Sequence, residues 1–589
     1  MLTHLHPSPI PRDAVQTDVN PTNSGQLGRR ALIKGTAATA AAVAATTAIT
    51  TGAASAATSA YFQHGVASGD PLPGAVVLWT RVTPTATSLP GSGVGPSITV
   101  TWQVARDAAF TTIVASGNQS TSPARDHTVK VDATGLAAAT TYYFRFSYSG
   151  VRSPVGRTRT APAAGSSVEN LRLGVVSCAN LQAGWFSAYR HLAAREDLHA
   201  ILHLGDYLYE YGPGQYGYGK DEVDIRPHSP AREMVTLADY RQRHAQYKQD
   251  ADLATLHAKY AFITTWDDHE VTNDAWRDGA ENHTPLVEGS WATRRASAQK
   301  AYDEWMPIRL SGTAALGDGT QIYRRLAFGQ LAELSMLDLR TYRDRQVTGL
   351  LGVTSDPTGL LATGEVSDPA RTITGRAQLD WLKGSLETGR AQWKLVGNPV
   401  MIAPVDLGAL PNDLTDPVAD ITGILPRDGM PYNTDQWDGY TDDRRELISH
   451  IRDQGVRDTL FLTGDIHSGW AADVPHDPAL YPVTGDSAAV EFVCTSVTSN
   501  NLKDITGAPS RSASIVVEEA IKANNLHIKY LNFDDHGFSV LDLTPARAQM
   551  DWFVIGDRAD KATGIAWTAS YETRAGENKV RPVAKPVNA

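Results

Sequence analysis

Metal-binding side chains follow five of the strands that the sequence predicts. Each strand is a short apolar run that ends in Asp, Asn, His, Cys or Tyr within a few residues. Open α/β sheets place their sites just beyond the carboxyl ends of strands. One Gly-Asp pair is common in turns, but five such endings indicate a shared site. They are Ser177-Cys178-Ala179-Asn180, Gly205-Asp206-Tyr207-Leu208-Tyr209, Asp267-Asp268-His269-Glu270 with Asn273 shortly after, Gly397-Asn398, and Gly464-Asp465-Ile466-His467.

Three of these side chains indicate which cations the site could hold. The Asp206 carboxylate has two oxygens and suits a bridge between two cations. Tyr209 carries a phenol whose unperturbed pKa is about 10, so it ligates only a strong Lewis acid such as ferric iron. The Cys178 thiolate is also favoured by a soft or strongly acidic metal. Together they indicate a strongly Lewis-acidic metal beside a bridging carboxylate.

The remaining ligands favour a second kind of cation. Asp268 and Asn398 offer oxygen atoms, which suit calcium, manganese or magnesium. Asp465 and His467 are separated by one residue, so on an extended segment both point to one face and could reach two metals. His269 is best placed toward substrate, as a phosphate donor or general acid.

Several residues have more than one interpretation. Arg226 and His228 lie in a polar insertion and could bind phosphate oxygens or belong to a surface loop. Asp267 could be an exposed cap. Cys178 and Cys494 could form one disulfide, although Cys494 is more typical of a buried small hydrophobe on a strand.

A second acid and histidine cluster, Asp534-Asp535-His536-Gly537, precedes a predicted strand over 538–543. We interpret it as a turn that supports the site at most indirectly.

The elements that must position these residues alternate between strands and helices from residue 164 to residue 589. This alternation predicts a layered α/β domain. The predicted strands are 171–176, 200–204, 260–266, 333–338, 392–396 and 459–463, and the predicted helices are 237–258, 375–388 and 442–454.

Residues 57–163 read as an all-β domain. Strand-like runs at 75–82, 98–104 and 128–131 are separated by Gly, Pro, Asn and Ser clusters. Leu136 precedes Tyr142 by six residues and resembles the tyrosine corner of immunoglobulin and fibronectin-type sandwiches. We predict an N-terminal immunoglobulin/fibronectin-like β-sandwich, which we expect to be a packing or lid module.

Residues 1–56 read as a twin-arginine export signal that is cleaved. Arg29-Arg30-Ala31-Leu32-Ile33-Lys34 precedes an apolar run over about 35–53 and the small residues Ala54-Ser55-Ala56. The run is too rich in Ala, Thr and Gly for a convincing membrane anchor. We expect the twin-arginine translocase to export the folded chain, so the protein is secreted, either extracellular or in the periplasm or cell wall.

The charge of the chain limits its partners. A formal net charge of −11 makes a nucleic-acid-binding surface unexpected. A phosphate-ester substrate is still expected to bind if local metal cations supply positive charge.

The motifs resemble those of the PhoD-type alkaline phosphatases, a branch of the calcineurin-like metallophosphoesterases, over nearly the whole mature chain. The matching segments are Phe62-Gln63-His64-Gly65-Val66-Ala67-Ser68-Gly69-Asp70-Pro71, Trp79-Thr80-Arg81, His203-Leu204-Gly205-Asp206-Tyr207-Leu208-Tyr209-Glu210, Trp266-Asp267-Asp268-His269-Glu270 and Gly464-Asp465-Ile466-His467-Ser468. The resemblance implies Fe³⁺ held by Cys178, Asp206, Tyr209 and His467. It also implies one or two Ca²⁺ ions held by Asp206, Asp268, Asn398 and Asp465, with Asn273 less certain.

We therefore expect an alkaline phosphatase or phosphodiesterase that hydrolyses phosphoesters through a metal-activated hydroxide. Asp206 would hold the metals, with Mn²⁺ or Mg²⁺ as alternative ions, and His269 would donate to the phosphate or leaving oxygen. The substrate would be a small phosphomonoester or phosphodiester, or a phospholipid or teichoic-acid-like polymer. Two alternatives stay open: a phospholipase-D-like hydrolase, which a related branch of the family implies, and a non-catalytic exported binding protein.

Overall fold

The computed structural model describes residues 60–310, 321–347, 364–406, 431 and 433–588. The predicted export signal, residues 1–56, lies outside these ranges. None of the helices in the described part of the chain has both the length and the apolar character that a membrane span requires.

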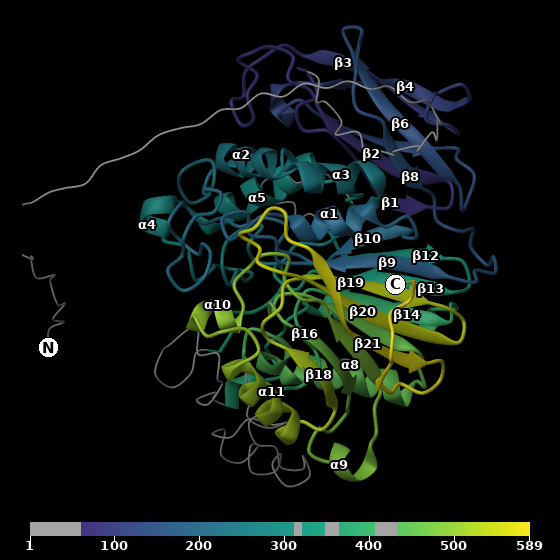
Figure 1. Cartoon of the computed structure of the whole chain (residues 1–589), viewed down its shortest axis with the longest axis vertical. Coiled ribbons are helices and arrows are strands. Elements are labelled where there is room, and N and C mark those ends of the chain that lie inside the picture. Colours follow the sequence, from purple (N-terminus) through teal and green to yellow (C-terminus); the bar gives the residue numbers. More distant parts are fainter. Residues whose placement is uncertain (1–59, 311–320, 348–363, 407–430, 432, 589) are drawn as a thin grey trace, which may run out of the picture. The chain divides into compact units, whose positions relative to one another are not determined.

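Two large sheets form the body of the described chain (Figure 1). The first has the strand order β22-β21-β20-β19-β9-β10-β11-β1-β2-β5, and the second has the order β12-β13-β14-β15-β17-β16-β18. Strands β9, β10 and β11 are parallel, as are β13, β14, β15 and β17. The first sheet contains β1 (Val66–Leu72), β2 (Ala75–Arg81), β5 (Thr128–Thr134), β9 (Leu171–Val176), β10 (Ala200–His203), β11 (Ala261–Thr264), β19 (Gly537–Leu543), β20 (Arg547–Ile555), β21 (Ile565–Arg574) and β22 (Arg581–Pro582). The second contains β12 (Arg324–Phe328), β13 (Ala332–Met336), β14 (Trp393–Asn398), β15 (Thr459–Thr463), β16 (Gly469–Val474), β17 (Ala489–Val493) and β18 (Ile528–Asn532).

An apolar core lies between the two sheets. Leu173 and Leu202 from the first sheet pack in one cluster with Leu395 and Leu462 from the second. The central strands are buried along their whole length, which is why they read in the sequence as continuous apolar runs. The predicted layered α/β fold is confirmed.

Helices cover the outer face of each sheet. The first sheet is covered by α1 (Ser187–Ala194), α2 (Leu237–Lys248), α3 (Ala251–Lys259) and α5 (Trp291–Trp305). The second is covered by α6 (Arg376–Thr388), α8 (Thr441–Asp453) and α11 (Ala513–Asn524). The helix predicted over 237–258 is two helices, because Asp250 accepts a hydrogen bond from the backbone N–H of Leu253 and starts α3.

The N-terminal strands form the predicted sandwich, but one of its layers belongs to the first large sheet. Strands β1, β2 and β5 pack on a third sheet made of β4 (Ile113–Thr121), β3 (Ile98–Ala105), β6 (Thr141–Tyr148) and β7 (Val151–Arg152), with β8 (Gly156–Arg159) beside β6. The Tyr142 hydroxyl accepts a hydrogen bond from the Ala137 N–H at 2.9 Å, as a tyrosine corner should. Strand β1 pairs in parallel with β11, so pairing satisfies an edge that an isolated sandwich would expose. The predicted boundary at 163 falls in the irregular segment between β8 and β9. The first large sheet nevertheless contains strands from both sides of this boundary.

Buried histidines make the fold sensitive to acid. His527 is buried next to β18 and donates from Nε2 to the Pro404 carbonyl at 2.7 Å. Burial lowers the pKa of His527 to about 4. Because the unfolded chain binds this proton more readily, stability is lost as pH falls from about 6.5 toward 4, by about 3 kcal/mol for this group.

We expect His527→Gln to reduce that loss. Glutamine keeps a donor for Pro404 but cannot be protonated. Chemical denaturation of both proteins at pH 7.5 and at pH 4.5 measures the difference. An equal loss of unfolding free energy in both proteins would contradict the assignment.

Candidate metal centre

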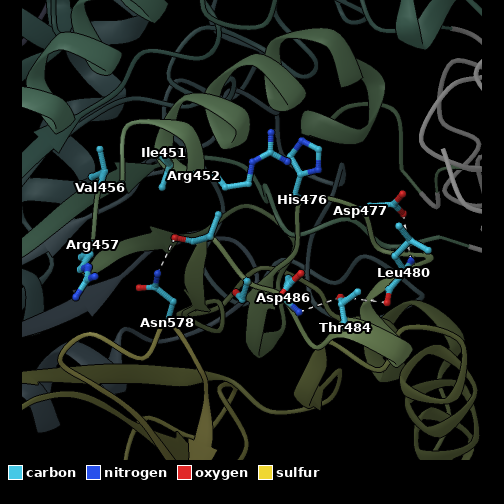
Figure 2. A pocket seen from close by; sticks show the side chains of 13 residues that line it. Ile451, Arg452, Val456, Arg457, His476, Asp477, Leu480, Thr484, Asp486 and Asn578 are labelled. Carbon is cyan, nitrogen blue, oxygen red and sulfur yellow. Dashed lines mark hydrogen bonds between the residues drawn. The ribbon is translucent and has the colours of Figure 1, made fainter. Parts of the chain in front are cut away.

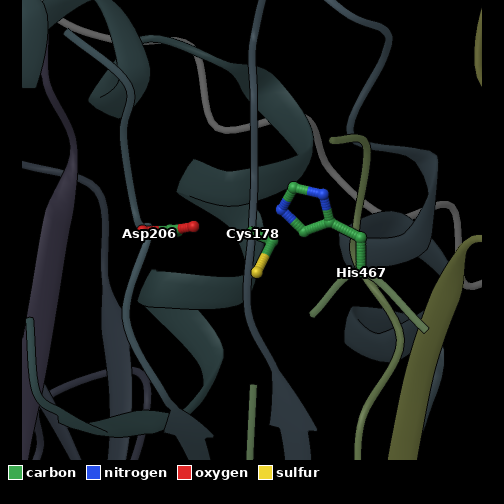
Figure 3. A group of neighbouring side chains, drawn as sticks. All are labelled: Cys178, Asp206 and His467. Atoms are coloured by element: carbon green, nitrogen blue, oxygen red, sulfur yellow. The ribbon is translucent and has the colours of Figure 1, made fainter. Parts of the chain in front are cut away.

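The loops that follow β9, β10, β11 and β15 meet at one end of the two sheets. The side chains form three groups of three residues. Within each group, one possible ligand atom from every residue lies within 4.8 Å of those of the other two. The groups share Asp206 and Asp268, so they form one continuous cluster. Figure 3 shows the Asp206 carboxylate and the His467 imidazole directed toward one another on either side of Cys178. The groups are Cys178, Asp206 and His467; Asp206, Asp268 and His269; and Asp267, Asp268 and Asp465.

The backbone at these residues is left-handed. The φ angles are 58° at Cys178, 54° at Asp206, 64° at Asp465 and 53° at His467. Each such residue costs roughly 1–3 kcal/mol, and it persists only where the surroundings over-determine the conformation. Gly205 has a φ of 106°, and a Cβ there would lie 2.9 Å from the Asp267 nitrogen. The loop after β10 therefore touches the loop after β11 through a position that only glycine can occupy.

The Tyr209 hydroxyl lies inside the first group. It donates to Asp206 Oδ2 at 2.8 Å and lies 3.3 Å from His467 Nε2. Burial raises the pKa of Tyr209 well above its usual value, and it raises the pKa of the Cys178 thiol in the same way. Both groups are neutral unless a cation replaces their protons.

Two buried carboxylate oxygens of the cluster lack a hydrogen-bond donor. Asp206 Oδ1 and Asp268 Oδ1 have no hydrogen-bond partner among the described residues. A buried, unsatisfied acceptor costs about 1–3 kcal/mol, and more if it is charged. Burial raises the pKa of Asp206 well above its usual value, with Asp268 and Asp267 adding to the effect. A bound cation would satisfy both oxygens, so the donor set suits a metal.

His269 is held as a cation at the edge of the cluster. Its Nδ1 lies 2.8 Å from Glu210 Oε2, and Glu210 is buried. Burial lowers the pKa of His269, but Asp268 and Glu210 outweigh it and bring this pKa well above the ordinary value. The ring also lies with its centroid 4.1 Å from that of Tyr209. His269 can therefore hold a proton next to Asp206 and Asp268.

Arg340 is a part of the site that the sequence analysis missed. Its guanidinium donates to both oxygens of Asp267, to Asp465 at 3.3 Å and to Asp435 at 3.1 Å, and it lies 3.7 Å from Asp268 Oδ1. One arginine thus contacts four carboxylates. The available signal was its position four residues after β13, at a sixth strand end.

Glu270 was also missed as a separate residue, although it lies in a quoted motif. Its carboxylate accepts hydrogen bonds from the backbone N–H groups of Asp206 at 3.1 Å, Tyr207 at 2.5 Å and Asp267 at 2.8 Å. Glu270 therefore joins the loop after β10 to the loop after β11.

Two residues predicted to contact phosphate also make structural contacts. Arg226 donates to Asp250 at 2.5 Å. His228 is buried, with Nδ1 2.8 Å from the Tyr211 carbonyl and Nε2 3.1 Å from the Tyr247 hydroxyl. These contacts fasten the polar insertion to α2 and α3, and a phosphate-binding role for Arg226 and His228 stays a prediction.

The two predicted asparagine ligands differ. Asn398 Oδ1 accepts from the Trp437 indole at 3.0 Å, and its Nδ2 lies 3.1 Å from Thr463 Oγ1. Asn398 is thus tied into a buried network, and its role as a ligand stays a prediction. Asn273 donates from Nδ2 to Glu281 at 2.8 Å, and its Oδ1 stays a predicted ligand.

Both cysteines are free and buried. The disulfide alternative is therefore wrong, and Cys494 lies in the core between the sheets as a small hydrophobe. The exposed-cap alternative for Asp267 is wrong as well, because Asp267 is buried against Arg340.

A separate pocket of about 530 Å³ opens at the other end of β15 (Figure 2). Arg452 and Arg457, which precede β15, line it together with His476 and Asp486. Five strand residues at about 3.3 Å each separate its floor from Asp465 by roughly 16 Å. This pocket is not part of the cluster.

A layered α/β fold with carboxylate, imidazole, thiol and phenol groups gathered at strand ends is the arrangement of a metal-binding enzyme centre. Comparisons with known proteins are consistent with this class. A family model described as "PhoD-like phosphatase" matches residues 173–552, and "PhoD-like phosphatase, N-terminal domain" matches residues 42–162. The chain belongs to the PhoD-like phosphatase family, which confirms the resemblance seen in the motifs.

Two relatives are similar over most of their length. Alkaline phosphatase D of Bacillus subtilis (strain 168) is 34% identical over 524 residues, which cover 89% of this chain and 82% of that protein. The solved "Structure of PhoD" has a TM-score of 0.77 at 33% identity and covers 90% of this chain and 93% of that one.

We expect Arg340→Met to destabilise the metal-free protein by about 3–5 kcal/mol, because it leaves buried carboxylates without their shared cation. Chemical denaturation in the presence of a chelator measures this change, and added Ca²⁺ should recover part of it. Arg452→Met is the control, since Arg452 is half exposed and its ion pair is with Asp453, which is also exposed. Equal denaturation midpoints for Arg340→Met and the control would contradict the role of Arg340.

Proposed function

We propose that this chain is an exported phosphoric ester hydrolase whose reaction takes place at a centre of ferric iron and one or two calcium ions. The observation that carries the proposal is a pair of buried oxygens, Asp206 Oδ1 and Asp268 Oδ1, which accept no hydrogen bond from the described residues and lie in three overlapping groups of candidate ligands. Family membership supports the reaction class.

The donor chemistry supports a division of the ions. Cys178, Asp206, Tyr209 and His467 would hold iron, since thiolate and phenolate favour a strong Lewis acid. Asp206, Asp268 and Asp465 would hold calcium, with Asn273 and Asp267 nearby and Mn²⁺ or Mg²⁺ as alternatives. When bound, such cations neutralise phosphoryl oxygens and lower the pKa of a water toward 7.

The protein's own groups then orient and protonate the substrate. His269 carries a proton beside the shared carboxylates and is placed to donate it to a phosphate or leaving oxygen. Glu210 accepts from Nδ1 of His269, which fixes the ring and keeps it charged. Asp206 sets the spacing of the ligand groups on either side of it, and Arg340 offsets the charge of carboxylates that hold no ion.

The substrate in this proposal is a small phosphomonoester or phosphodiester, with phospholipid or a teichoic-acid-like polymer as larger members of the same chemical class. The acidic chain supports a substrate that is bound through cations rather than through surface lysines and arginines.

Asp206→Asn should lower turnover by on the order of 10³-fold or more and reduce the bound metal, because it weakens a ligand shared by two groups. Elemental analysis, a visible spectrum and paired monoester and diester assays test this result. Tyr209→Phe should remove the coloured band that phenolate on ferric iron produces. Asp453→Asn, an exposed carboxylate, is the control. Full activity in Asp206→Asn, or an active enzyme without iron or colour, would refute the proposed centre.

Replacing Arg29 and Arg30 by lysine should block export, because the twin-arginine translocase reads that pair. Activity in the medium or periplasm, compared with activity in the cytoplasm, measures the outcome. The variant should keep its activity in cell extracts. Undiminished export would contradict this part of the proposal.

A further inference from the structure

One loop contacts three of the four residues that we propose as iron ligands. This support loop, residues 496–501, follows β17. Its Ser499 hydroxyl lies 2.6 Å from the Tyr209 hydroxyl and 2.9 Å from the Cys178 carbonyl. Its Asn500 carbonyl lies 2.7 Å from His467 Nδ1. The loop therefore touches the centre through Tyr209, the backbone of Cys178 and His467.

The contact with His467 determines which nitrogen of that ring is free. Because a carbonyl only accepts, Nδ1 carries the proton, and the lone pair is left on Nε2. Nε2 lies 3.3 Å from the Tyr209 hydroxyl. A hydrogen bond of this kind orients a metal-binding histidine and sets its tautomer.

Arg558 fixes the support loop from behind. This arginine follows β20 and is 1% exposed. It donates from Nη2 to the Asn500 side-chain oxygen, from Nη1 to Asp504 and from Nε to the Ala183 carbonyl at 2.8 Å. One planar guanidinium thus joins the support loop to the start of α10 (Leu502–Thr506) and to the segment after β9.

The second acid and histidine cluster of the sequence belongs to the same network. His536 lies between Asp504, 2.8 Å from its Nε2, and Ser496, 2.8 Å from its Nδ1. Ser496 also bridges in parallel to Ser177, next to Cys178. Ser496 and His536 are buried, so we interpret these hydrogen bonds as structural and do not assign Ser496 as a nucleophile.

We propose that Arg558 is a positioning residue of the metal centre, which holds the support loop so that Tyr209 and His467 present their ligand atoms to one cation. The inference rests on the proposed iron site. A planar fork that reaches Asn500 and Asp504 at once cannot be replaced by the single ammonium of lysine.

The test compares Arg558→Lys and Arg558→Met with the wild type for binding of Fe³⁺ alone and for the visible band of the iron form. We expect Fe³⁺ affinity to fall about 10–100-fold and the band to shift or weaken, in line with losses of outer hydrogen bonds at metal sites. Arg558→Lys keeps a charge beside Asp504, so it stays informative if Arg558→Met does not fold.

Two further variants separate the outcomes. Arg81→Met removes an equally buried arginine, which pairs with Asp126 in the N-terminal sandwich, and should lower stability without changing iron affinity. His467→Ala removes a proposed ligand directly. If His467→Ala binds iron weakly but both Arg558 variants keep wild-type iron affinity and colour, the role of Arg558 is wrong and the proposed centre stands. Undiminished iron binding in His467→Ala would overturn the proposed centre and this inference with it.

Discussion

The crowding of buried carboxylates between the strand ends is the constraint on which the rest of the site depends. Asp206, Asp267 and Asp268 are buried and Asp465 is half-buried, so an uncompensated charge on any of them would be expensive. Arg340 and the His269 cation offset part of this charge. Asp206 Oδ1 and Asp268 Oδ1 still accept no hydrogen bond from the described residues, and this is where we propose that a cation binds.

Holding such a cluster together requires a rigid backbone. Left-handed residues turn the chain sharply after β9, β10 and β15, and each of these turns is fastened by buried hydrogen bonds. Glu270 ties two of the loops through three backbone N–H groups, and the support loop ties Tyr209 to His467. The strained backbone conformations therefore occur at the candidate ligands, and the hydrogen bonds around them stabilise these conformations.

The N-terminal sandwich contributes to the same body of structure. Strand β1 extends the first large sheet, and Asp70 on β1 binds Arg324 on β12 at 2.6 Å, so this strand also reaches the edge of the second sheet. Trp79 donates to the Glu304 carbonyl at 2.8 Å, and Lys130 donates to Asp303 at 2.6 Å, both on α5. These contacts agree with a packing role for the sandwich and explain why its sheet does not end at the boundary drawn from the sequence.

The sequence by itself determined the central strands and the layered α/β class, and it predicted metal ligands at Cys178, Asp206, Tyr209, Asp268, Asp465 and His467, because apolar periodicity and polar strand ends are local signals. It could not determine that these candidate ligands come from two different sheets, since the core between Leu202 and Leu395 aligns strands far apart in the chain. For the same reason it did not find Arg340 and Arg558. Their contacts depend on which buried partners, Asp267 or Asn500, lie within hydrogen-bonding distance, and only the packing of the chain decides that.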